Sequence, residues 1–189
     1  MTINIRYKTF ETNSSSVHTI VFHKTDFSNV IDDTYMEIHG GSYTRCPEPP
    51  LIDIEERLNY LWTGLWDLHT SYKHENNEWI TIVDKKGLQW WKDAIHMYCP
   101  NAILYDIKEE DWYGVDHANE LTPLFCAMKT DISILKDFLL DPLGKIYISG
   151  DEYDDDSEEP FDRNEIPWVD EYEKLISYAD DVYVYVKGN

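Results

Sequence analysis

Apolar residues follow two different periods along this chain, and the way these periods interleave limits the folds it can adopt. Six short segments alternate like strands or are rich in β-branched residues: 17–22, 35–39, 78–84, 102–107, 145–149 and 182–186. Four segments repeat apolar residues at helical spacing: 52–70, 86–99, 131–140 and 168–179. Strands and helices mix without a regular strand–helix–strand repeat. We therefore expect an α+β fold with a mixed sheet and four or five helices, and a doubly wound α/β fold is the alternative.

The length of the chain is that of one domain. It has 189 residues, and its 7 Trp, 14 Tyr and 6 Phe supply bulky material for a core. A chain of this size buries about 70% of the surface that its unfolded form exposes. We expect residues 1–189 to form a single domain, in which segment 151–165 departs from the fold as an acidic excursion.

Negative charge dominates the chain and is unevenly distributed. There are 37 acidic residues against 16 Lys and Arg, a formal net charge of −21. Residues 151–181 hold fourteen acids and two bases, a net charge of −12. Such a surface repels nucleic acid and anionic lipid, and it attracts the cationic surfaces with which proteins hold DNA or RNA. Solubility alone is the alternative explanation of the acidity.

The acidic excursion is the predicted contact surface for a partner. Spaced carboxylates can occupy several phosphate positions in a cationic groove, and aromatic residues provide the anchors that dominate protein interfaces. The predicted contact residues are Asp151, Glu152, Tyr153, Asp154, Asp155, Asp156, Glu158, Glu159, Phe161 and Trp168. A calcium loop of the EF-hand type fits poorly, because Glu159 stands where that loop requires glycine.

The cysteines indicate a reducing compartment and no metal site. Cys46, Cys99 and Cys126 are an odd number without the spacing of a disulfide framework. His96 lies three residues before Cys99, but no second close pair of Cys or His ligands completes a zinc site. The N-terminus lacks a signal-peptide core, and no apolar run approaches the ~18 residues of a membrane helix. We expect a cytoplasmic protein, with no membrane association and no cofactor.

A dense polar stretch precedes the first predicted strand. Ser14, Ser15 and Ser16 follow Asn13 and stand two residues before His18. Asn and Ser side chains stabilise turns by bonding to nearby backbone amides, which is the structural interpretation. The functional interpretation is a polar pocket, in which the candidate catalytic residues are Ser16, His18, Asp116 and His117. No nucleophile elbow, P-loop or dinucleotide-binding glycine motif accompanies them.

The same stretch carries a resemblance to a known family. The residues that match are Arg6, Phe10, Glu11, Asn13, Ser14, Ser15, Ser16 and His18. They form the pattern R-x-x-x-F-E-T-N-S-S-S-x-H, which resembles the N-terminal signature of a family of small phage and prophage proteins. Two further segments look similar to that family, Val115–His117 and the run from Asp137 through Pro142 to Gly150 and Asp151. Most family members have no assigned activity, so the resemblance implies a mobile genetic element and no reaction.

Two functions are consistent with these observations. The first is a non-enzymatic, phage-encoded inhibitor of the anti-CRISPR kind, which docks its acidic surface onto the basic channel of a host nucleic-acid-binding protein such as a CRISPR effector nuclease. Such a protein would not bind nucleic acid directly. The second is an enzyme or small-ligand-binding protein that uses the cluster of Arg6, Ser14–Ser16 and His18.

Overall fold

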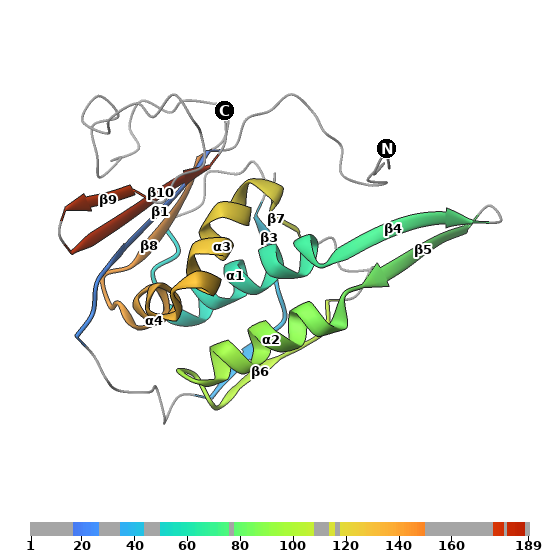
Figure 1. The fold of residues 1–189 in the computed structure, drawn as a ribbon, viewed down its shortest axis with the longest axis horizontal. Helices are drawn as coiled ribbons and strands as arrows, with labels where there is room; N and C mark the ends of the chain where they lie inside the picture. Colours follow the sequence, from blue (N-terminus) through green and yellow to red (C-terminus); the bar gives the residue numbers. More distant parts are fainter. Residues whose placement is uncertain are drawn as a thin grey trace.

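The residues that the structure describes form an α+β fold, with four α-helices and several small sheets (Figure 1). The computed structural model describes residues 17–26, 35–43, 50–75, 78–107, 114–115, 118–149, 176–179 and 181–187. A four-stranded antiparallel sheet has the order β8 (Lys145–Ser149), β1 (Val17–His23), β10 (Val182–Lys187), β9 (Ile176–Ala179). In the described part of the chain, parallel pairing is confined to two pairs of short strands, so the doubly wound alternative is not found.

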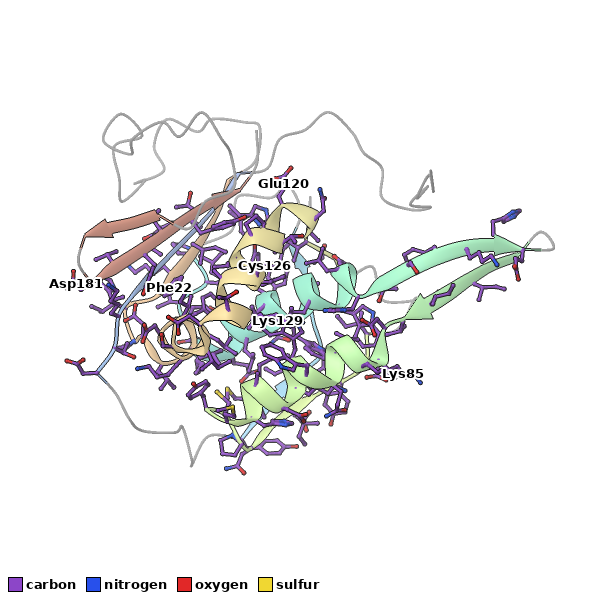
Figure 2. All side chains as sticks on the ribbon, viewed as in Figure 1. Phe22, Lys85, Glu120, Cys126, Lys129 and Asp181 are labelled. Atoms are coloured by element: carbon purple, nitrogen blue, oxygen red, sulfur yellow. The ribbon has the colours of Figure 1, made fainter. Side chains whose placement is uncertain are left out.

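The central strand β1 forms because its residues alternate between two environments. His18, Ile20 and Phe22 are at most 1% exposed and face the helices. Ile20 lies opposite Tyr185 on β10 and opposite Ile146 on β8, so apolar side chains stack across the sheet. Phe22, labelled in Figure 2, packs against Phe138 on helix α4 (Ile132–Leu140), with 5.7 Å between the ring centroids.

Helix α1 (Ile54–Leu68) is the central helix of the fold and is buried along most of its length. Its start is fixed by Glu56, whose Oε2 accepts hydrogen bonds from the backbone amides of Ile52 and Asp53. Leu58, Leu61 and Leu65 are at most 1% exposed, as the apolar period predicts. A second face carrying Arg57 and Tyr60 is also buried, and this face holds the polar contacts described below.

The remaining elements surround α1. Helix α2 (Lys85–His96) begins with the N-cap Asp84, and helix α3 (Thr122–Thr130) follows a 3-10 turn, η1 (Ala118–Leu121). Strand β2 (Met36–Ile38) pairs with β6 (Ala102–Leu104), and β3 (Ser42–Tyr43) pairs with β7 (Gly114–Val115). Strands β4 (Thr70–Glu75) and β5 (Glu78–Val83) form a hairpin that projects from the body of the molecule (Figure 1). One cluster of buried apolar side chains joins the sheet and the helices.

The prediction of a helix over 168–179 is wrong at its C-terminal end. Residues Ile176–Ala179 form strand β9, which pairs antiparallel with β10 through Ile176 and Val184. The sequence of this segment has a helical period, but its last residues pair with the edge of β10 instead. Ile and Tyr favour strands, and hydrogen bonds to β10 outweigh the helical preference. Residues 168–175 lie outside the described residues.

Candidate functional site

Of the residues in the N-terminal motif and the predicted polar pocket, the structure describes only His18. The others lie outside the described residues: Arg6, Phe10, Glu11, Asn13, Ser14, Ser15, Ser16, Asp116 and His117. The predicted contact surface over 151–168 also lies outside them, as does Cys46. The structure therefore shows the position of one motif residue. That the other residues lie close to it in space stays a prediction.

His18 lies in the interior, where strand β1 crosses the central helix. Its side chain is fully buried, and its Nδ1 is 2.8 Å from the hydroxyl oxygen of Tyr60 on α1. The two rings are tilted by 52°, with centroids 5.7 Å apart. This hydrogen bond satisfies a buried polar atom on each side, and it fixes the position of β1 over α1.

Tyrosines from two further elements, Tyr43 on β3 and Tyr185 on β10, lie near this pair. The ring of Tyr43 on β3 meets the ring of Tyr60 edge-on at 5.1 Å, and the hydroxyl of Tyr185 on β10 donates to the carbonyl oxygen of Glu120 on η1. We call His18, Tyr43, Tyr60, Tyr185 and Glu120 the buried tyrosine cluster. Burial raises the pKa of Tyr60 well above its ordinary value, and the nearby Tyr185, Tyr43 and Glu120 raise it further.

The chemistry available to the buried tyrosine cluster is limited by this burial. With its pKa raised, the Tyr60 phenol stays protonated at physiological pH and serves as a hydrogen-bonding group. His18 has no exposed surface through which a substrate would reach it. Within the described residues, His18 has the surroundings of a structural histidine.

A second polar cluster joins the end of β1 to helix α4. The carboxylate of Asp141, 2% exposed, accepts hydrogen bonds at Oδ2 from the backbone amide of His23 at 2.7 Å and from His23 Nδ1 at 2.9 Å. Its Oδ1 accepts from the amide of Leu143 at 2.8 Å. Asp137, one turn earlier, accepts from the amide and the hydroxyl of Thr25, both at 3.0 Å. Two buried carboxylates thus tie β1 and the residues after it to α4.

Arg57 completes this cluster from the central helix. Its guanidinium is buried and donates to two carbonyl oxygens at the end of α4, those of Phe138 at 2.6 Å and Asp141 at 2.7 Å. Burial lowers the pKa of Arg57, and the charge of Asp141 opposes that shift. We call Arg57, His23, Thr25, Asp137 and Asp141 the α4 anchor. It gives Asp137 and Asp141 a structural role.

Two side chains that the sequence did not indicate, His69 and Asp84, lie together at the base of the β4–β5 hairpin. Asp84 accepts from the amide of Gly87 at 3.1 Å and lies 3.2 Å from Nδ1 of His69. The Gly87 amide, with a smaller contribution from His69, lowers the pKa of Asp84. The pair borders an open hollow of about 240 Å³ that Ser71 also lines, but within the described residues no hydrogen bond joins Ser71 to His69. The pair joins the start of α2 to the end of α1.

The residues considered for zinc have different surroundings. His96 Nε2 is 2.8 Å from the carbonyl oxygen of Ala102, and Cys126 is exposed on α3. Cys99 is buried, which raises the pKa of its thiol to about 11. Among the residues that the structure describes, no three His, Cys, Asp or Glu side chains gather as metal ligands.

No helix in the described ranges combines the length and the apolar character that crossing a bilayer requires. Comparison of the chain with protein-family models, with curated protein sequences and with solved structures found no match in any of the three.

Proposed function

We propose that this protein is a phage-encoded, non-enzymatic inhibitor that acts in the host cytoplasm. It docks its acidic surface onto the basic nucleic-acid channel of a host defence protein of the CRISPR effector kind. The observation that carries this proposal is the segregation of charge, because residues 151–181 hold a net charge of −12 out of −21 for the whole chain.

The physical basis is competition with phosphate. A channel that holds nucleic acid is lined by Lys and Arg, and its field accelerates the approach of a negatively charged protein. Carboxylates spaced along 151–165 would occupy positions that phosphates otherwise fill. Since screening shortens the reach of charges to ~8 Å at physiological ionic strength, such docking weakens as salt is added.

The burial of His18 also favours a binding function over an enzymatic one. The enzyme alternative requires His18 to face a substrate beside the serines, whereas its ring is buried and bonded to Tyr60. The buried acids Asp137 and Asp141 likewise serve the α4 anchor. These three polar side chains contribute to holding the fold together.

The test compares two variants that remove the same charge from different places. In the first, Asp154, Asp155 and Asp156 become Asn, and Glu158 and Glu159 become Gln. In the matched control, five exposed acids of the described body are changed in the same way: Asp26, Glu55, Glu75, Asp93 and Asp106. Both variants are first checked for an unchanged thermal unfolding midpoint.

The readouts are inhibition of DNA cleavage by purified RNA-guided nucleases and capture of basic nucleic-acid-binding proteins from host lysate at low and high salt. We expect the first variant to lose binding and inhibition, and the control to keep both. Equal loss in the two variants would mean that only net charge matters, and it would overturn the assignment of 151–165. Unchanged binding by the first variant would overturn it as well.

A further inference from the structure

The β4–β5 hairpin, which we call the arm, leaves both of its outer edges unpaired within the described residues. It projects from the body of the molecule (Figure 1), and its strands pair only with each other, from Thr70 and Val83 at the base to Glu75 and Glu78 at the tip. An isolated two-stranded hairpin is only marginally stable in water. A free edge is also a template for pairing with another strand.

The two edges of the arm differ in how well they are protected. Charged residues on an edge strand discourage pairing, and β4 carries Lys73, His74 and Glu75. Residues 79–83 of β5, in contrast, read Trp-Ile-Thr-Ile-Val without a charge, in a chain with 37 acids and 16 bases. Ile80 and Ile82 are 43% and 48% exposed. The β5 edge is therefore apolar, rich in β-branched residues and open.

The hydrogen-bond pattern of the arm fixes which backbone groups face that edge. The amide of Asp84 donates to the carbonyl oxygen of His69 at 2.7 Å, so positions 84 and 69 form a hydrogen-bonded pair at the base. Such pairs alternate along an antiparallel ladder. With the observed register, Trp79, Thr81 and Val83 then direct their backbone N–H and C=O groups outward, away from β4.

We propose that two copies of this protein associate by pairing their β5 strands antiparallel, about a two-fold axis at Thr81. In this register Thr81 faces Thr81 of the second copy, and Trp79 faces its Val83, so all three outward-facing positions find hydrogen-bonding partners. Ile80 faces Ile82 of the second copy, and Ile82 faces its Ile80. These four isoleucines lie on one face of the joined sheet, at positions where side chains approach most closely.

Thr81 itself provides a second observation. Its hydroxyl oxygen is buried and has no hydrogen-bond partner among the described residues. Buried polar groups in folded proteins are nearly always paired. A two-fold axis at Thr81 places the same residue of the second copy opposite it, and facing threonines are a recurrent hydrogen-bonding pair in antiparallel sheets.

Charged residues flank the paired segment at both ends of the arm. The tip carries Glu75 and Glu78, whereas the exposed Lys85 and Lys86 follow Asp84 at the base, where Figure 2 shows Lys85. In this register Glu78 lies opposite Asp84 of the second copy, and Lys85 and Lys86 follow one and two residues further along the chain. Strands of six residues extend ~20 Å, more than two screening lengths at physiological salt, so the arm also separates the two acidic bodies.

Added salt should strengthen this dimer, whereas it should weaken the proposed docking on a basic partner. The contact consists of backbone hydrogen bonds and apolar side chains, while the net charge of −21 on each copy opposes it. Added salt screens that repulsion and strengthens the dimer. The contact is small, so we expect a weak dimer whose population depends on concentration. It does not depend on the proposed function.

Sedimentation velocity on the full chain, over a range of protein concentrations at low and high salt, measures the dimer directly. We expect the dimer fraction to rise with protein concentration and with salt concentration. Thr81→Pro removes an outward N–H and none of the arm's own hydrogen bonds, so it should yield a monomer with unchanged circular dichroism. Ile80→Lys should do the same, whereas Ser71→Lys, on the same face of the arm but on β4, should leave the dimer intact.

Cysteine cross-linking tests the register. Facing residues of a hydrogen-bonded antiparallel pair lie ~5.5 Å apart at Cα, within the range that a disulfide spans. Mild oxidation of Thr81→Cys should give a covalent dimer, whereas Tyr72→Cys, directly across the arm on β4, should give none beyond the wild-type background. A wild-type chain that stays monomeric at every concentration and salt would overturn the proposal. A dimer that survives Thr81→Pro would overturn it too.

Discussion

The Nδ1 atom of His18 lies 2.8 Å from the hydroxyl oxygen of Tyr60, so the last residue of the N-terminal motif is bonded to the middle of the central helix. Both side chains are at most 1% exposed. In a buried setting, a hydrogen bond between a strand and a helix fixes their relative position as well as contributing to stability. Variants of His18 will therefore affect folding whether or not the motif has a further role.

Tyr60→Phe tests the strength of this connection. Deleting the phenolic oxygen removes a buried hydrogen bond from His18, and we expect the free energy of unfolding to fall by about 1–2 kcal/mol. Urea denaturation followed by tryptophan fluorescence measures this change. Tyr105→Phe is the matched control, because Tyr105 is 38% exposed and its variant should change the free energy by less than about 0.5 kcal/mol. Equal stability of Tyr60→Phe and wild type would show that the contact contributes nothing.

The contribution of Asp131 to the free energy of unfolding should depend on pH. It caps α4 by accepting hydrogen bonds from the amide and the hydroxyl of Ser133, at 3.0 and 2.6 Å, and these bonds lower its pKa in the folded state. A lowered pKa contributes stability that is present above the unfolded value, near 4, and is lost as pH falls through the folded value. Asp131→Ala should cost about 1 kcal/mol at pH 7.

This difference between Asp131→Ala and wild type should shrink as the pH is lowered from 5 toward 2. Asp131→Asn is the control, since an asparagine caps the helix without titrating, and its unfolding free energy should exceed that of the alanine variant by a constant amount over this range. Denaturant midpoints at several pH values supply the comparison. A wild-type advantage over alanine that is the same at pH 2 and pH 7 would argue against the ionised cap.

Local patterns predicted most of the regular elements. The alternation in 17–22 and 182–186 and the apolar period in 52–70 correspond to β1, β10 and α1, because one face of each element is buried and the residue types record it. Strand β4 was missed because both of its faces are largely exposed, so its sequence has no apolar alternation. Helix α3 was also missed, although Pro123 at its start and apolar residues at helical spacing signal it.

The polar clusters could not be predicted in the same way. Arg57 bonds to residues 81 and 84 positions away, and Asp141 bonds to His23 across 118 positions. A single sequence does not show which distant residues will meet. A charged residue in a helical period is normally assigned to the solvent face, and for Arg57 that general expectation fails. The helical period placed residues 137–140 in a predicted helix, but it did not indicate which residues Asp137 and Asp141 contact.

The rate of alkylation should differ between Cys126 and Cys99. Cys99 is buried and its pKa is raised to about 11, whereas Cys126 is exposed on α3. Alkylation requires an accessible thiolate, so iodoacetamide at pH 8 should modify Cys126 readily and Cys99 only after unfolding. Peptide mapping by mass spectrometry, in a Cys46→Ser background, gives the two rates separately. Similar rates for Cys99 and Cys126 in the native protein would contradict the buried position of Cys99.

Gly144 lies close to Arg57, so substitutions at these two positions should affect stability in a coupled way. A Cβ added at Gly144 would overlap Nη1 of the Arg57 guanidinium, which is held in place by the carbonyl oxygens of Phe138 and Asp141. Gly144→Ala should therefore displace the guanidinium and cost about 1–3 kcal/mol, the usual range for overpacking a buried site. Arg57→Leu should be destabilising by itself, because it removes the guanidinium hydrogen bonds to the carbonyl oxygens of Phe138 and Asp141.

The two substitutions at this site should not be additive. In the Arg57→Leu background the guanidinium is gone, so Gly144→Ala should cost much less than it does in the wild type. A double-mutant cycle measured by denaturant unfolding should then give a coupling free energy of about 1 kcal/mol or more, since residues in direct contact couple on this scale. Gly114→Ala is the control, because a Cβ there meets nothing closer than 3.5 Å and should add independently of Arg57→Leu. Additivity of the Gly144 and Arg57 substitutions would mean that the guanidinium does not occupy the space beside Gly144 in solution.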